Sequence, residues 1–140
     1  MISLPFQSKF SSQKKKKNFS YFLFTFSQDW NISQLLDTVF FTFCVPLRDT
    51  CTFYESFNPQ SACLQQGGNP LDFAFGETDS MEITPNMYQD GVIVKYYHGI
   101  KCPNHLDMIT QIRVHCDRLA GTGNPYEMYI DDKSCVTTIE

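Results

Sequence analysis

The sequence predicts an all-β protein, built as a flattened barrel or sandwich of two antiparallel sheets and stapled by disulfides. Three observations favour this fold class. Short apolar segments alternate with polar residues from Cys51 onward, turn-forming residues separate them, and six cysteines occur among 140 residues. Alternation with a period of two is typical of half-buried strands, and an even cysteine count in a small, loop-rich chain is typical of a disulfide framework.

Residues that favour turns bound each expected strand. Asn58-Pro59, Gly67 to Pro70, Asp90-Gly91 and the "GTGNP" run at 121–125 interrupt the apolar segments. Between these turns we expect strands, in chain order, within residues 51–63, 72–76, 91–97, 108–116, 126–132 and 134–140. Only "ISQLLDTVFF", at 32–41, shows a weak 3.6-residue period that is typical of a helix.

Side chains alternate between the two faces of a strand, so two of the expected strands have predictable faces. Within 91–97, Val92, Val94 and Tyr96 are expected on one face, and Ile93, Lys95 and Tyr97 on the other. Within 108–116, the side chains expected to face inward on the second strand are Ile112, Val114 and Cys116. Those expected on the opposite face of the second strand, toward solvent, are Gln111, Arg113 and His115.

Residues 1–44 differ from the rest of the chain. Lys14 to Lys17 form a basic run, and the short apolar segment "FSYFLFTFS" follows it. This order is typical of a signal peptide or signal anchor, although an arbitrary start of a fragment explains it equally well. The apolar runs are too short to span a bilayer. We therefore expect an atypical N-terminal segment at 1–44, targeting or disordered, and a β domain at 45–140.

Charge is distributed unevenly between the two parts of the chain. Residues 1–50 hold six Lys or Arg and three acids, about +3, whereas residues 51–140 hold five against twelve, about −7, which sums to the total of −4. Proteins that bind nucleic acid present a basic face to the phosphates. The acidic β domain is therefore not expected to bind nucleic acid.

The cysteines stand at positions 44, 51, 63, 102, 116 and 135. Such a set favours disulfides and the secretory pathway, although six cysteines permit fifteen pairings. The alternative is a zinc site drawn from Cys102, His105, His115 and Cys116. His115 and Cys116 are adjacent on an expected strand and point to opposite faces, so we expect no metal site.

The order and spacing of several motifs resemble the mannose 6-phosphate receptor homology domain, of the type repeated in the cation-independent receptor. The motifs are Tyr96-x-x-Gly99-x-x-Cys102, an alternating strand that ends in Cys116, and Cys135 before a last strand. Cys51 and Cys63 match the opening cysteine hairpin of that family. The resemblance covers residues 45–140.

The resemblance implies which cysteines pair. It gives Cys51–Cys63 and Cys102–Cys135, whereas Cys116 would pair with a cysteine beyond Glu140. Cys44 precedes the first hairpin. We therefore expect Cys44 and Cys116 to be unpaired in this chain and the domain to be truncated at its C-terminus.

The family's sugar-binding members use an inward-facing Gln, Arg, Glu and Tyr, and the resemblance transfers these positions one by one. The Gln corresponds to Gln65 or Gln66, and the Glu corresponds to Glu127. The Arg position holds Met108 and the Tyr position holds Thr137. Arg113 cannot replace the lost Arg without a register slip, because it lies on the opposite face of its strand.

We therefore expect a lectin-like lumenal domain of a receptor in lysosomal or secretory-pathway sorting, in which sugar binding is weakened or lost. The resemblance implies N-glycans, glycoproteins or protein cargo as partners, and a membrane only through other parts of a longer chain. It implies a location in the Golgi, endosome or lysosome lumen, or outside the cell. The alternative is a non-lectin structural or protein-interaction repeat of a trafficking receptor.

Catalysis is not expected, and neither is a cofactor. The sequence has no Gly-x-Ser-x-Gly or comparable nucleophile motif. The Gly-Thr-Gly at 121–123 lacks the Lys-Ser/Thr of a phosphate-binding loop and indicates a turn.

Overall fold

The computed structural model describes residues 2–4, 29–48, 51, 58–69, 72–116, 119 and 123–140. The basic run and the apolar segment that follows it lie outside these residues, so the expected targeting role of that segment remains a prediction.

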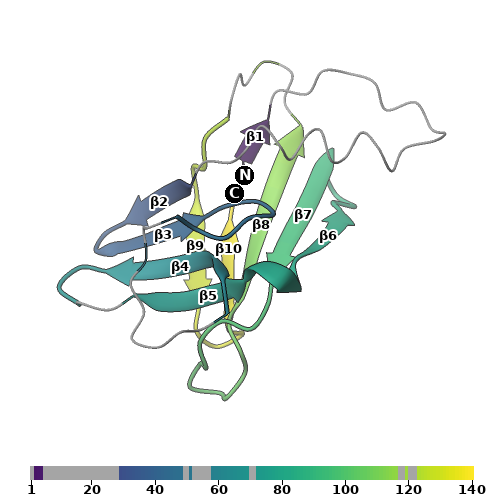
Figure 1. Cartoon of the computed structure of the whole chain (residues 1–140). Coiled ribbons are helices and arrows are strands. Elements are labelled where there is room, and N and C mark those ends of the chain that lie inside the picture. Colours follow the sequence, from purple (N-terminus) through teal and green to yellow (C-terminus); the bar gives the residue numbers. More distant parts are fainter. Residues whose placement is uncertain are drawn as a thin grey trace.

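A four-stranded antiparallel sheet forms one layer of the protein (Figure 1). Its strands follow the chain order β2 (Trp30–Gln34), β3 (Asp37–Phe41), β4 (Gln60–Gln66) and β5 (Phe73–Glu77). Each strand pairs with its sequence neighbour, which is the simplest topology for strands joined by short turns.

The second, larger sheet has the strand order β6 (Glu82–Pro85), β7 (Gly91–Tyr96), β8 (Ile109–Cys116), β10 (Val136–Ile139) and β9 (Met128–Asp131). The 3-10 turn η1 (Thr78–Ser80) lies between β5 and β6 and so leads from the smaller sheet to the larger one. Pairing is antiparallel except along one edge of β8, where β10 and the short β1 (Ile2–Leu4) both run parallel to it.

The predicted sandwich is confirmed: the described residues are nearly all β, and the inner faces of two sheets form one core. The strands of the two sheets run at a large angle to each other (Figure 1). The sheets do not close into a barrel within the described residues. The fully buried side chains that fill the core from the two sheets include Val39, Phe41, Phe75, Tyr96, Ile112 and Ile139.

The predicted faces of β7 and β8 agree with this core. Val94, Tyr96, Ile112 and Val114 are buried, and Val92 packs against them partly buried. Arg113 lies on the opposite face of β8, where its guanidinium donates to the Glu140 carboxylate over 2.6 Å. The side chain of Cys116 lies outside the described part of the chain.

The β domain begins earlier than the expected boundary at residue 45. Trp30 to Phe41, which we expected to belong to a separate segment, provide two of the four strands of the smaller sheet. The weak helical period at 32–41 does not correspond to a helix, because a two-residue turn at Leu35-Leu36 folds this stretch into a hairpin. Val39 and Phe41 face the core and pair with Leu64 and Ala62 of β4, so the hairpin is part of the sandwich.

Two cysteine pairs connect distant parts of the chain, and they are the pairs that the resemblance implies. Cys51 is bonded to Cys63 of β4, and Cys102 is bonded to Cys135, which immediately precedes β10. Cys44 carries a free, half-buried thiol whose pKa is raised by burial. Disulfides persist in oxidising environments, which indicates a secretory or extracellular setting.

Tyr96 joins the two sheets through its hydroxyl group. The ring is fully buried in the core, and the hydroxyl donates to the carbonyl of Thr42 over 3.0 Å. The same oxygen accepts from the Cys44 backbone N–H at 3.1 Å. Burial of this group raises the pKa of Tyr96 to about 12.

We expect removal of the two disulfides to have unequal costs. They enclose loops of 33 and 12 residues. On a loop-entropy estimate, the Cys102→Ala/Cys135→Ala variant loses about 4 kcal/mol of unfolding free energy and the Cys51→Ala/Cys63→Ala variant about 3 kcal/mol. Urea titration measures both values. A larger loss for the shorter loop would contradict the estimate.

The raised pKa of Tyr96 predicts a loss of stability at high pH. An unfolded tyrosine ionises near pH 10, whereas the folded group keeps its proton until about pH 12. This contribution is complete below pH 10 and declines as pH rises to 12, by about 2–3 kcal/mol. Urea titrations between pH 10 and 12 should show that the unfolding free energy declines more steeply with pH in wild type than in Tyr96→Phe. Equal pH dependence in the two proteins would contradict the raised pKa of Tyr96.

Candidate functional site

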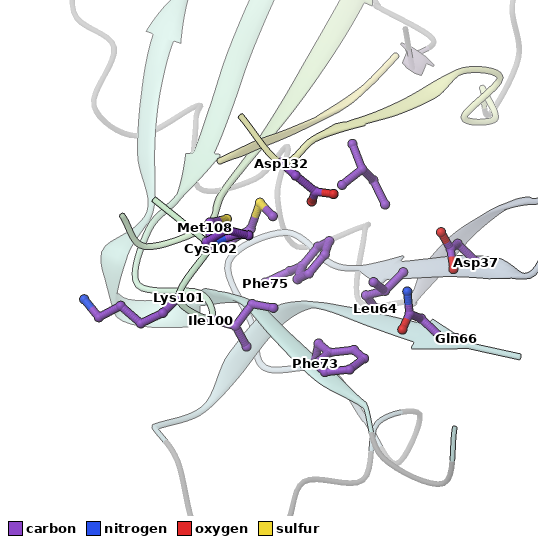
Figure 2. Close-up of a pocket in the computed structure, with 12 residues that line it drawn as sticks. Asp37, Leu64, Gln66, Phe73, Phe75, Ile100, Lys101, Cys102, Met108 and Asp132 are labelled. Atoms are coloured by element: carbon purple, nitrogen blue, oxygen red, sulfur yellow. The ribbon is translucent and has the colours of Figure 1, made fainter. Parts of the chain in front are cut away.

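A pocket of about 340 Å³ opens between one end of the smaller sheet and the loops of the larger sheet. Figure 2 shows its lining residues converging from both sheets. The strands β3, β4 and β5 provide one wall, and the 100–108 loop with the end of β9 and the following turn provides the other. Eight of its twelve lining residues are apolar, and four polar side chains give it polar surface in a similar amount.

Two polar side chains lie at the edge of the inner face of the smaller sheet. Asp37 of β3 and Gln66 of β4 are register partners, and they occupy the same face as the buried Val39 and Leu64. Figure 2 shows the Asp37 carboxylate beside the Gln66 amide at the mouth of the pocket. The core face therefore changes from apolar to polar at this edge.

The resemblance assigns one position to either Gln65 or Gln66, and alternation along β4 places these two side chains on opposite faces. Gln66 lines the pocket, whereas Gln65 lies on the outer face of the sheet. The Gln65 amide donates to the Asp72 carboxylate over 3.2 Å, and both residues line a second hollow on that side. The structure therefore places Gln66, and not Gln65, in the pocket between the sheets.

Asp132 brings a carboxylate to the pocket from the opposite wall. It follows the last residue of β9, in the turn that leads to Cys135. Figure 2 shows its side chain extending toward the space above Phe75. No sequence pattern marks this residue, because an aspartate in a turn after a strand is usually exposed to solvent.

The floor of the pocket is apolar. Phe75 is fully buried and Met108 nearly so, while Phe73 and Ile100 are partly buried against the core. Phe73 lies near Gln66 in the close-up (Figure 2). A half-buried aromatic ring can pack against an apolar face of a ligand while neighbouring polar groups bind its edge.

The cation in the lining is already paired. The Lys101 ammonium lies 2.5 Å from one Asp107 oxygen, and His98 Nδ1 lies 3.7 Å from the other. The hydrogen bond from Lys101 is the main cause that lowers the pKa of Asp107. Figure 2 shows the Lys101 chain directed away from Asp37 and Asp132. The two carboxylates therefore make the pocket electrostatically negative.

The two positions to which the resemblance assigns an Arg and a Tyr meet beneath the pocket. Met108 and Thr137 are both buried, and the Thr137 hydroxyl donates to the Met108 sulfur over 3.4 Å. Their burial makes them part of the core. Met108 and Thr137 are thus in contact with each other, and their side chains offer a ligand no charge.

Glu127 lies away from this pocket. It is exposed, and its backbone pairs with that of Glu140 at the opposite end of β9 and β10. Met128 and Ile130 of β9 face the core, so alternation directs Glu127 to the outer face. The structure therefore does not bring Glu127 together with Gln66, Met108 and Thr137.

The alternative zinc site lacks one of its ligands. Cys102 is bonded to Cys135, so its sulfur is not available as a thiolate. Within the part of the chain that the structure describes, no group of three or more His, Cys, Asp or Glu side chains is placed to hold a metal ion.

No protein-family model matches this sequence, and no curated protein matches it significantly. Among the described residues, no helix has the length and apolar character needed to cross a membrane.

We expect substitutions at the pocket floor to affect stability unequally. Met108→Ala should cost about 2–4 kcal/mol of unfolding free energy, because it leaves a cavity in the core. Thr137→Val removes only a weak bond to sulfur and keeps the volume, so it should cost less than about 1 kcal/mol. Urea titration of both variants checks this, and a larger cost for Thr137→Val would contradict the role given to its hydroxyl.

Proposed function

We propose that this chain is a lectin-like domain of a receptor in the secretory pathway or outside the cell. Its resemblance to the mannose 6-phosphate receptor homology domain and its disulfide-bonded β-sandwich support this assignment. A role in lysosomal or secretory-pathway sorting, on the lumenal side of Golgi or endosomal membranes, follows from the resemblance alone.

One observation carries the proposal: Asp37, Gln66 and Asp132 converge at the mouth of a pocket whose floor is apolar. Carboxylates accept hydrogen bonds from hydroxyl groups, and an amide both donates and accepts. The partly buried ring of Phe73 offers a surface for the C–H face of a sugar. This combination suits a ligand with neighbouring hydroxyl groups, such as a terminal hexose of an N-glycan.

The charge of the pocket favours a neutral sugar over a phosphorylated one. Asp37 and Asp132 contribute negative charge, while Lys101 is paired with Asp107 and points away. The family's Arg position holds the uncharged Met108. A phosphate group would therefore meet repulsion with no free cation in the described lining.

The proposed activity is binding without catalysis, because the sequence has no Gly-x-Ser-x-Gly or comparable nucleophile motif and the Cys102 sulfur in the lining is held in a disulfide. The alternative function, a protein-interaction repeat, draws support from an exposed leucine pair at the β2–β3 turn.

The test is glycan binding by a matched pair of variants. Neutral high-mannose glycans should bind the wild-type chain, and Gln66→Ala or Asp132→Asn should weaken binding about tenfold or more, because each removes a ligand hydrogen bond. Gln65→Ala, one residue away on the outer face, is the control and should bind as wild type does. Isothermal titration calorimetry measures each affinity.

Mannose 6-phosphate and Glu127→Gln supply two further comparisons. We expect the phosphorylated sugar to bind more weakly than methyl mannoside, and Glu127→Gln to leave the affinity unchanged. Tighter binding of the phosphorylated sugar, or a loss confined to Glu127→Gln, would contradict the pocket described above. Absence of binding to any glycan would refute the lectin function itself.

A further inference from the structure

Two leucines form the tip of the β2–β3 hairpin, where solvated turns normally carry polar residues. Leu35 is fully exposed, at 100% of its surface, and Leu36 is 74% exposed. Gln34 and Asp37 are the last register partners of the hairpin. The turn between them therefore consists of the two leucines alone. Large contiguous apolar patches rimmed by polar residues mark interaction sites, and these two leucines form the apolar part of such a patch only together with the neighbouring polar residues.

The backbone of the turn is also unfavourable for this sequence. Leu35 has φ of 56°, in the left-handed region, which γ-branched and other bulky side chains rarely adopt. Two-residue hairpins with positive φ at the first central position normally place Gly there. Both the conformation and the exposure of Leu35 therefore act against stability, and backbone outliers of this kind cluster at functional sites.

The neighbouring hairpin holds the leucine pair in place. The Gly67 backbone N–H donates to the Leu36 carbonyl over 2.7 Å. A Cβ on Gly67 would lie 3.4 Å from the Leu36 side chain, so the two turns are in close contact. The tip is thus presented by two linked hairpins and not by a single free loop.

A polar hollow of about 350 Å³ adjoins the leucine tip. Its lining residues come from both hairpins, and they are Leu36, Thr38, Gln65, Gln66, Gly67, Asn69 and Asp72. Asp72 is the charged residue of this lining, which contains no Lys, Arg or His. The hollow therefore places one carboxylate, which accepts from the Gln65 amide, three side-chain amides and one hydroxyl beside the two leucines.

We propose that Leu35, Leu36 and this hollow, together the leucine-tip surface, dock a segment of a partner protein in which an apolar side chain stands next to Lys or Arg. The apolar side chain packs on the leucines, and the cation reaches Asp72. Charge complementarity favours this occupant over a lipid surface, because segments that bind membranes carry Lys or Arg beside their apolar residues.

The leucine-tip surface is distinct from the sugar pocket, although Gln66 borders both hollows. Leu35, Leu36 and Asp72 do not line the sugar pocket, so variants at these three positions test docking separately. The proposal stands or fails independently of glycan binding.

The experiment is selection from a randomised 12-residue peptide library on the disulfide-bonded chain, followed by fluorescence anisotropy of the enriched peptides. Leu35→Gly/Leu36→Ser replaces the pair with residues that this turn prefers, so it should fold at least as stably as wild type. It should weaken peptide binding at least tenfold. Asp72→Asn should weaken binding several-fold and reduce its sensitivity to salt.

A matched control comes from the β6–β7 turn, where Met87 and Tyr88 are 86% and 95% exposed. Met87→Ser/Tyr88→Ser should leave peptide affinity unchanged. Enriched peptides without the apolar–basic pair, equal binding to Leu35→Gly/Leu36→Ser, or no enrichment at all would overturn the proposal. So would tighter binding of the wild-type chain to anionic phosphatidylserine vesicles than to any peptide.

Discussion

The Cys102–Cys135 disulfide is the constraint on which the described site depends. It ties the loop before β8 to the turn before β10, two segments that lie 33 residues apart in the chain. The Ile109 N–H donates to the Cys135 carbonyl over 3.0 Å, which starts the parallel pairing of β8 with β10 beside the bridge. Met108, Thr137, Lys101 and Asp132 all lie within three residues of Ile109 or of a bridged cysteine. The bridge therefore holds one whole wall of the pocket.

The other wall follows from where the apolar pattern of the smaller sheet ends. Along the inner face of β3 and β4, the register pairs run from Phe41 and Ala62 through Val39 and Leu64 to Asp37 and Gln66. The first two pairs are buried in the core, and the last pair is polar. Burying a polar side chain without a hydrogen bond costs free energy, so the sheets separate at this edge and leave a hollow. The same strand alternation thus packs the core at one end of the sheet and lines the pocket at the other.

Much of this arrangement could be predicted from sequence because a strand's two-residue period assigns faces directly. Ile112, Val114 and Arg113 lie on the faces that alternation indicated. The β2–β3 hairpin was missed because Leu35-Leu36 lacks the Gly or Asn that signals a tight turn, while tertiary pairing with β4 overrides the local helical period. The contribution of Asp132 depends on how β9 and its turn approach the other sheet. Counting back from a cysteine cannot reveal that approach. The resemblance assigns Glu127 by such a count, and the structure places Glu127 on the outer face.

Disulfide mapping tests the central claim most directly. The chain should be expressed into an oxidising compartment, alkylated without reduction, digested and analysed by mass spectrometry. The account predicts one peptide pair that links Cys102 to Cys135, another that links Cys51 to Cys63, and alkylation of Cys44. Alkylation of Cys102 and Cys135 before reduction, or a bridge from either of them to another cysteine, would contradict it, because the wall that carries Asp132 and Met108 would lose its anchor.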